Sequence, residues 1–242
     1  SPPGTAASWA GTTAEAQLMR GRAVVADNIV SLGEAEALGA AAEAMGFETA
    51  GVDVRASRDA AEPEKAELRP EIRDNERVVF DDHELAKALY ARISGTLPAT
   101  VAGPRKTELV IDSLAPRLRF YRYRTGGAFH PHVDGALTMR ADDGTELQLY
   151  ATVLIFLSRV DAGGETVFFS LASASGGAHR THNAGMFNGA ALREVARVEP
   201  TPGRMVAFHH KLIHAGSRVQ GQAPKYVLRA DAMYRRTVSG DP

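Results

Sequence analysis

Three residues of this sequence, two of them neighbours and one far away, have the side chains of a metal site. His132 and Asp134 are spaced H-x-D. Residues two apart in an extended segment point to the same side, so this imidazole and carboxylate can converge on one point. A third ligand must come from elsewhere, and His214 in the late segment 208–214 is the best candidate. Two imidazoles and one carboxylate form the facial ligand set of non-heme Fe(II), which leaves coordination positions open.

Other histidines compete for these positions, and H-x-D pairs also occur by chance in loops. His130 lies two residues before His132, where it could be a ligand, line a pocket or face solvent. His210 is the alternative to His214, and we otherwise interpret His209 and His210 as histidines at a strand end. Three further histidines have no partner pattern and are expected at the surface: His83, His179 and His182.

The sequence around these ligands carries an ordered set of motifs. They are LRFYRYRTGGAFHPHVDG (118–135), YATVLIFLSRVDAGGETVFF (150–169) and PGRMVAFHHKLIHAGSRVQGQAPKYVLRADAMYRR (202–236). In this order they resemble the prolyl 4-hydroxylase-like branch of the Fe(II)/2-oxoglutarate oxygenases. The resemblance covers about half of the chain, from residue 118 to residue 236. It implies His132 and Asp134 as ligands, with His214 as the distal ligand because Gly-x-x-Val follows it.

The resemblance also implies a pocket for 2-oxoglutarate. The far carboxylate of this cosubstrate needs a buried cation, because an unpaired buried charge is costly. The family places a Lys or Arg on the last strand, which corresponds to Lys225, with Arg229 as the rival on the same strand face. Lys225 follows His214 by eleven positions, where the family usually has ten. Tyr123 and Thr166 are expected to line the pocket.

The resemblance implies an enzyme that uses Fe(II), 2-oxoglutarate and O2, with ascorbate as an optional reductant. The expected reaction is hydroxylation of an unactivated C–H bond, with release of succinate and CO2, in a prolyl or other peptidyl residue or in a free amino acid or related small metabolite. Asp134 argues against halogenation, because halogenases of the superfamily have Ala or Gly there. A tailoring oxidase that desaturates or cyclises a natural product is one alternative. A zinc-dependent hydrolase or cupin-like binding protein is another. Substrate contacts are expected from Arg77, Asn75 or His130.

Two helices are expected in the first half of the chain. The first begins at a capping box formed by Ser31 and Glu34 and runs to about Met45, before a C-cap at Gly46. The second begins after Asp82. Its apolar face is spaced i, i+4, i+8, at Leu85, Leu89 and Ile93.

The second half is typical of strands separated by Gly, Asp and Pro turns. Strands are expected at 22–29, 47–54, 118–123, 148–158, 165–170, 203–210 and 225–234. The segment 56–70 is interpreted as a loop, and 170–201 as a lid with a short helix at 190–198. This pattern predicts an α+β fold around a β-sandwich or barrel. The resemblance implies that the β part is a double-stranded β-helix, or jelly roll.

Length and composition fit one domain. The chain has 242 residues, 44% of them hydrophobic, which suits a single β-rich domain. We expect a flexible arm at 1–17, which contains Trp9, a helical support region at 18–108 and the catalytic core at 109–236. The absence of cysteine excludes disulfides and thiolate metal sites.

Charge and hydropathy bound the partners. The net charge of −1 gives no field that would attract nucleic acid or an anionic membrane. No apolar run approaches the roughly 18 residues of a membrane span, and 1–17 lacks the pattern of a secretory signal. We therefore expect a cytoplasmic protein with a small-molecule or peptidyl substrate and no nucleic-acid or membrane partner. The oligomeric state is left open.

Overall fold

Two antiparallel β-sheets form the body of the molecule. The computed structural model describes residues 22–51, 69–103, 107–135, 137–141, 143–171, 187 and 192–236. The large sheet has the order β1 (Ala23–Ala26), β13 (Met205–His209), β9 (Glu146–Phe156), β16 (Lys225–Arg236), β6 (Arg117–Tyr123), β3 (Glu76–Asp81) and β2 (Glu48–Thr49). It is extended by β5 (Glu108–Leu114), which pairs with β16, by β4 (Thr100–Ala102) on β5, and by β8 (Thr138–Arg140) on β9.

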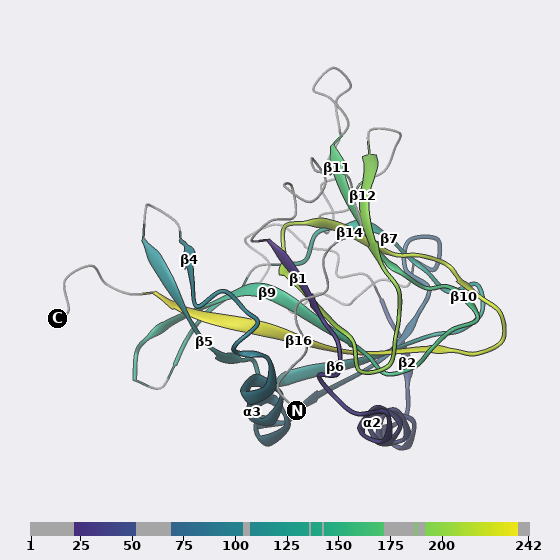
Figure 1. Cartoon of the computed structure of the whole chain (residues 1–242), viewed down its shortest axis with the longest axis horizontal. Helices are drawn as coiled ribbons and strands as arrows, with labels where there is room; N and C mark the ends of the chain where they lie inside the picture. The colour runs from purple at the N-terminus through teal and green to yellow at the C-terminus, as the bar shows by residue number, and fades with distance from the viewer. Residues whose placement is uncertain are drawn as a thin grey trace.

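The small sheet faces the large one and has four strands. Their order is β12 (Leu192–Val198), β11 (Thr166–Leu171), β14 (Ile213–Gly216) and β7 (Phe129–His132). A two-stranded ladder of β10 (Ala162–Gly163) and β15 (Val219–Gln220) closes one end. This is the double-stranded β-helix that the sequence predicts, and it runs from β5 to β16 (Figure 1).

The alternation of side chains along the strands separates a catalytic face from a supporting face. On β9, Thr152 and Leu154 point into the space between the sheets, while Val153 and Ile155 belong to a core on the outer face. The same alternation on β16 sends its odd-numbered residues from Lys225 to Arg229 inward. The even-numbered residues Leu228 and Ala230 of the same strand point to the outer face and pack in the core there.

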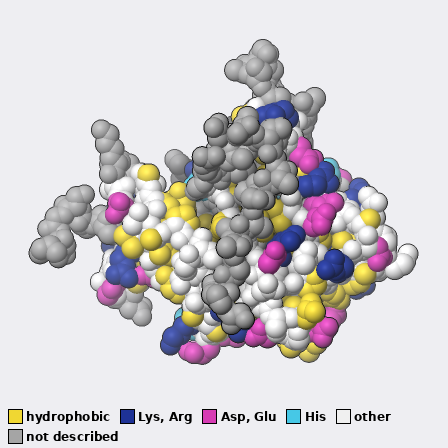
Figure 2. Space-filling model, in the orientation of Figure 1, with side chains coloured by type: hydrophobic (Ala, Val, Ile, Leu, Met, Phe, Trp, Pro, Cys, Tyr) yellow, Lys and Arg dark blue, Asp and Glu magenta, His cyan; other side chains and the backbone are white. Residues whose placement is uncertain are grey.

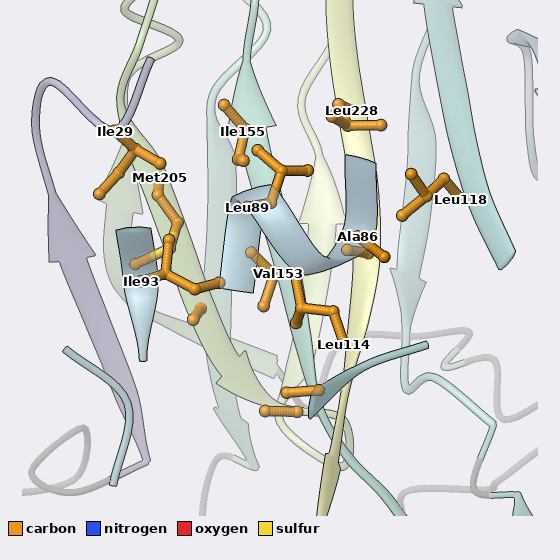
Figure 3. Close-up of a cluster of buried hydrophobic side chains, with 14 of the residues drawn as sticks. Ile29, Ala86, Leu89, Ile93, Leu114, Leu118, Val153, Ile155, Met205 and Leu228 are labelled. Carbon is orange, nitrogen blue, oxygen red and sulfur yellow. The ribbon is translucent and has the colours of Figure 1, made fainter. Parts of the chain in front are cut away.

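Two helices cover that outer face of the large sheet, as expected. In Figure 1, α2 (Leu32–Met45) and α3 (His83–Ile93) both lie below the large sheet. Ser31 and Glu34 form the predicted capping box, and the side chain of Asp82 caps α3 by accepting from Leu85 N at 2.9 Å. Figure 3 shows apolar side chains of α3 among those of the sheet, including Ala86, Leu89, Ile93, Val153, Ile155 and Leu228.

The expected helix at 190–198 is wrong, because residues 192–198 form strand β12. In this strand two buried residues, Val195 and Val198, lie three positions apart, which is not the spacing of a regular strand. A β-bulge explains this spacing. Phe168 pairs with Ala196 but Phe169 pairs with Glu194, so Val195 is an extra residue in the ladder. One extra residue breaks the period of two and lets positions three apart share a face.

The expected strands of the first half of the chain are present only in part, and three expected segments lie largely outside the described residues. The strand predicted at 22–29 is present but shorter, as β1, and the 47–54 prediction corresponds to the two residues of β2. The sequence analysis did not foresee β3, which pairs with β6 along its whole length. The arm 1–17, most of the 56–70 loop and most of the 170–201 segment lie outside the described residues.

The charged side chains of both signs are mixed on the visible surface (Figure 2), in line with the net charge of −1. Figure 2 shows Lys and Arg side chains interspersed with Asp and Glu on the face toward the viewer. Neither of the described helices has the length and apolar content needed to cross a membrane.

Candidate metal centre and cosubstrate pocket

The three predicted ligands meet between the two sheets. One ligand atom each from His132, Asp134 and His214 lies within 4.8 Å of the other two. Strands β7 and β14 bring the histidines together, because His132 and His214 are paired across that ladder. Asp134 follows two residues after His132, and its backbone N donates to the carbonyl of His210 at 2.8 Å. The far-apart segments of the sequence therefore converge as predicted.

Both histidines are oriented for metal binding. Nδ1 of His132 lies 2.7 Å from the carbonyl of His130, and Nδ1 of His214 lies 2.9 Å from the carbonyl of Leu212. Donation from Nδ1 to a carbonyl fixes the tautomer and leaves the Nε2 lone pair for a metal. Burial lowers the pKa of both imidazoles, which keeps them neutral. The Nε2 atoms of His132 and His214 lie 3.8 and 3.6 Å from the Asp134 carboxylate.

The Asp134 carboxylate is held on both oxygens. Arg229 Nη1 donates to Oδ1 at 2.8 Å, and Thr152 Oγ1 donates to Oδ2 at 2.5 Å. Burial raises the pKa of Asp134, but Arg229, the two histidines and Thr152 together lower it by more. The pKa of Asp134 therefore lies well below its usual range. Asp134 is therefore an ionised, fixed ligand.

Arg229 is in turn fixed by a second carboxylate. Its Nη2 donates to Asp231 Oδ1 at 3.0 Å, and Arg119 Nη1 donates to Asp231 Oδ2 at 2.9 Å. Sequence reasoning did not single out Thr152, Asp231 or Arg119. The signal was present in the strand periodicity. Thr152 is a polar residue in an otherwise apolar run, and Asp231 lies two residues after Arg229 on the same strand face.

Lys225 has a different environment, although it lies on the same face of β16. Its side chain is buried, and Nζ lies 5.0 Å from the ring centroid of Tyr123 and 5.4 Å from that of Phe156. Within the described part of the chain, no carboxylate forms an ion pair with it. Burial lowers the pKa of Lys225 to about 7, although Glu165 raises it slightly. A cation in this position lacks an anion.

A single cavity joins the metal ligands to Lys225. Its lining includes His132, Asp134, His214, Tyr123, Thr166, Lys225 and Arg229. Tyr123 and Thr166, the expected pocket residues, are both buried. Burial raises the pKa of Tyr123, so its hydroxyl stays protonated and able to donate.

The expected substrate contacts lie elsewhere. Asn75 is buried, and its side chain bonds Arg73 and the carbonyl of Glu76. Arg77 is half-buried on β3, and neither it nor Asn75 is among the described residues that line the cavity. His130 has an exposed side chain, and its carbonyl orients His132. Substrate contact by these three remains an untested expectation.

The donor set fits Fe(II) and 2-oxoglutarate. Two neutral imidazoles and one carboxylate on one side of the cavity are the ligands that non-heme Fe(II) uses. The two histidine tautomers and the double hydrogen bonding of Asp134 are the outer interactions that such a site requires. Lys225 supplies a cation to the same cavity, and it has no ion-pair partner among the described residues.

Comparison with known proteins agrees with this site. Residues 118–230 match the family model described as the 2OG-Fe(II) oxygenase superfamily. No curated protein matches the chain.

The fold is similar to three solved hydroxylase structures. A collagen prolyl hydroxylase of Paramecium bursaria Chlorella virus-1, solved with 2-oxoglutarate, is 18% identical with a TM-score of 0.50, over 88% of this chain and 96% of that chain. A Pseudomonas putida prolyl-4-hydroxylase is 14% identical with a TM-score of 0.50, over 92% and 97% of the two chains. A Trichoplax adhaerens prolyl hydroxylase, solved with a hypoxia inducible factor peptide fragment, is 14% identical with a TM-score of 0.52, over 90% and 86%. At such identities these likenesses establish the fold alone.

Proposed function

We propose that the chain hydroxylates an unactivated C–H bond, because residues 118–230 match the family model of the 2OG-Fe(II) oxygenase superfamily. The substrate is a prolyl or other peptidyl residue, or a free amino acid or related small metabolite. The protein is a 2-oxoglutarate-dependent dioxygenase whose cofactors are Fe(II), 2-oxoglutarate and O2. The observation that carries the proposal is the shared cavity of the His132, Asp134 and His214 triad and the unpaired Lys225.

Each residue of the site has one task in this reaction. His132, Asp134 and His214 hold the metal from one side. Lys225 binds the far carboxylate of 2-oxoglutarate, and Tyr123 donates to it or closes the wall beside it. When bound, the metal, cosubstrate and O2 supply the oxidising chemistry, in which 2-oxoglutarate becomes succinate and CO2 and a substrate C–H becomes C–OH.

Arg229 is a positioning residue and not the cosubstrate cation. It lines the same cavity as Lys225, but its guanidinium is already bonded to Asp134 and Asp231. Transferring it to 2-oxoglutarate would take one of two side-chain donors from a metal ligand and from a second buried carboxylate, which is costly. Lys225 forms no ion pair with a carboxylate among the described residues, so binding of 2-oxoglutarate would break none. The geometry therefore favours Lys225 for the cosubstrate.

Two other chemistries fit the site less well. A zinc hydrolase uses the same three ligands, but it has no use for a buried lysine without an anion. Halogenation needs a vacant coordination position where Asp134 stands. Desaturation or cyclisation of a natural product uses the same metal and cosubstrate site and remains the second candidate within the superfamily.

The proposal is tested first without a substrate. Anaerobic addition of Fe(II) and 2-oxoglutarate should give a weak visible charge-transfer band, and a succinate assay over a panel of amino acids and prolyl peptides then identifies the substrate. His132→Ala, Asp134→Ala and His214→Ala should each abolish the band, because two remaining ligands hold the ion poorly.

His210→Ala is the matched control, because only the backbone carbonyl of His210 supports Asp134. Loss of metal binding in His210→Ala with normal binding in His214→Ala would reverse the assignment of the distal ligand. A wild-type protein that gives no charge-transfer band, and is active with zinc instead, would refute the oxygenase proposal.

A further inference from the structure

Arg73 is a buried arginine behind the wall of the catalytic cavity, and its exposure is only 7%. Nε donates to Asn75 Oδ1 at 2.7 Å, and Nη1 contacts the carbonyl of Gly51 at 3.4 Å. Asn75 is itself held, because its Nδ2 donates to the carbonyl of Glu76 at 3.1 Å. The buried Nη2 has no hydrogen-bond partner among the described residues. Because a buried charged donor without an acceptor is costly, other contacts must hold the guanidinium there.

Two aromatic rings supply these contacts. Cζ of Arg73 lies 4.7 Å from the ring centroid of Phe129 and 5.2 Å from that of Tyr121. A guanidinium within about 6 Å of a ring face is attracted by the negative potential of that face, and more strongly where water is excluded. Phe129 belongs to β7 in the small sheet and Tyr121 to β6 in the large sheet. Arg73 therefore contacts both sheets.

The Phe129 ring connects Arg73 to a metal ligand. It stacks on the His132 ring, with 3.7 Å between centroids and 22° between planes. One face of a phenyl ring has no room for both an imidazole and a guanidinium at these distances, so Arg73 covers the opposite face. The order is therefore guanidinium, phenyl, imidazole. Phe129 lines the cavity, whereas Arg73 is not among the residues that line it, so Arg73 lies where it can support the site without touching a ligand.

The backbone of Arg73 supports the same strand. Strand β7 has four residues and lies at the edge of the small sheet. The segment before β3 pairs with its outer edge: His130 N donates to the carbonyl of Ile72 at 2.9 Å, and Arg73 forms a β-bridge with Phe129. His132 is the last residue of β7, so the position of this short strand determines where the ligand lies.

We propose that Arg73 is a positioning residue of the metal site, which fixes the ring of His132 through the ring of Phe129. The bond from Nδ1 of His132 to the carbonyl of His130 sets the tautomer, and the stack holds the plane of the ring. A ligand held in the productive orientation binds the metal more tightly than one that must first be ordered. The inference rests on the proposed function in one respect, that His132 is a metal ligand.

The test uses Co(II) as the probe, with the full chain and without 2-oxoglutarate. The visible absorption of bound Co(II) depends on the arrangement of its ligands, so one titration gives both the affinity and a signature of the geometry. Arg73→Met should weaken Co(II) binding about tenfold, the lower end of the effect of losing an outer contact of a metal-binding histidine, and should change the spectrum. A residue that only stabilises the fold would not change the spectrum of the folded protein.

Arg73→Lys is the conservative variant. It keeps a cation over the Phe129 ring but loses the planar fork. Its Co(II) affinity and spectrum should therefore lie between those of the wild type and Arg73→Met. The same variant carries the test if Arg73→Met does not fold, and it should then bind Co(II) more weakly than the wild type, with an altered spectrum.

A double-mutant cycle tests whether Phe129 transmits the effect. Phe129→Leu removes the ring, keeps an apolar side chain and should weaken Co(II) binding about as much as Arg73→Met. Adding Arg73→Met to Phe129→Leu should then weaken Co(II) binding by less than about twofold more, because the effects of coupled residues do not add.

Arg122→Met is the matched control. Arg122 also lies over a phenylalanine ring, with Cζ 4.4 Å from the ring centroid of Phe47, but neither residue is among those that line the cavity. This substitution should lower the unfolding temperature and leave the affinity and the spectrum of Co(II) unchanged.

Two results would overturn the proposal. In the first, Arg73→Met, or Arg73→Lys in its place, binds Co(II) with the affinity and spectrum of the wild type, which would make Arg73 a residue of the fold alone. In the second, the losses of Arg73→Met and Phe129→Leu multiply in the double variant, so Phe129 does not transmit the effect. A wild type that binds Co(II) but gives no charge-transfer band with Fe(II) and 2-oxoglutarate would instead refute the proposed function, so the two failures are distinguishable.

Discussion

Lys225 and Arg229 are two cations on one strand face whose different partners determine their roles. Arg229 holds a metal ligand, whereas Lys225 forms no ion pair with a carboxylate in the described part of the chain. Both residue types at this spacing were visible in the sequence, and the resemblance left both open. Only the packed structure shows that Arg229 already binds Asp134, because this contact joins β16 to a residue 95 positions away in the chain. Asp231, two residues after Arg229 on β16, is its second partner.

Removing the Lys225 cation should weaken 2-oxoglutarate binding and leave the Fe(II) affinity unchanged. Losing one member of a buried charge pair costs about 3–5 kcal/mol, so Lys225→Met should weaken 2-oxoglutarate binding by roughly two to three orders of magnitude. Titration of 2-oxoglutarate into the Fe(II) enzyme without oxygen measures this. Arg229→Met is the control, and there we expect the larger loss in Fe(II) affinity. A normal 2-oxoglutarate affinity in Lys225→Met would mean that Lys225 is not the cation that binds 2-oxoglutarate, and would favour Arg229 for that role.

The pKa of Lys225 predicts how cosubstrate binding depends on pH. Burial lowers this pKa to about 7 in the free enzyme, and the bound carboxylate must raise it. Above about pH 7, the complex therefore takes up a proton that the free enzyme lacks, and affinity should fall by up to about tenfold per pH unit. The same anaerobic titration across neutral and alkaline pH measures the slope. Lys225→Arg should bind more weakly but without this slope, because guanidinium stays charged. An equal slope in both proteins would contradict the assignment.

At the scale of elements, the turn before β16 decides where Lys225 lies. The sequence places Lys225 eleven positions after His214, one more than the family usually has, and the structure places the turn at Gly221 between β15 and β16. Gly221 has φ +91°, and a Cβ there would lie 2.2 Å from Asp161 Oδ2. Asp161 also accepts from Gln222 N at 2.9 Å. Glycine is therefore required for both conformation and space.

Gly221→Ala should move this turn and weaken 2-oxoglutarate binding by at least about tenfold, or ~1.4 kcal/mol, with Fe(II) affinity unchanged. Gly144→Ala is the matched control. Gly144 has a similar φ of +83°, but nothing lies within 4 Å of its Cβ position. It should lose about 1–2 kcal/mol of stability from backbone strain alone and keep its cosubstrate affinity. Equal effects of the two substitutions on 2-oxoglutarate binding would show that the turn does not position Lys225.

Elements with regular local patterns could be predicted, and those shaped by pairing could not. The capping box at Ser31 and the Asp82 cap fixed the helix starts, because these signals lie within four residues. Strand β3 was missed, since its residues ERVVFD carry charge and its partner β6 lies about forty residues later. Strand β12 was also missed, and the bulge at Val195 interrupts the period of two that indicates a strand. Arg73 could not be singled out either, because its burial depends on contacts with β6 and β7.

At the scale of the molecule, the strand alternation separates stability from chemistry. The space between the two sheets holds the metal ligands and Lys225, while the outer face of the large sheet packs against the two helices. The strand and helix pattern of the sequence predicted an α+β fold around a β-sandwich or barrel, and the resemblance to the oxygenase family implied the jelly roll. The side chains on the two faces of β9 and β16 are connected only through the strand backbone. A loss of packing on the outer face therefore need not move the metal ligands between the sheets.

A substitution in the helical layer should therefore reduce stability without changing the site. Leu89 on α3 is 2% exposed and packs among the apolar residues of the outer core, so Leu89→Ala should lower the free energy of unfolding by about 2–5 kcal/mol. Fe(II) and 2-oxoglutarate affinities of the folded protein should stay within about twofold, or ~0.4 kcal/mol. Denaturant unfolding and anaerobic titration measure the two quantities. Leu32→Ala is the control, because Leu32 on α2 is 65% exposed, and its loss should cost less than about 0.5 kcal/mol. If Leu89→Ala weakened cosubstrate binding as strongly as Gly221→Ala, the helices would be coupled to the site through the sheet, and the separation of the two faces would be wrong.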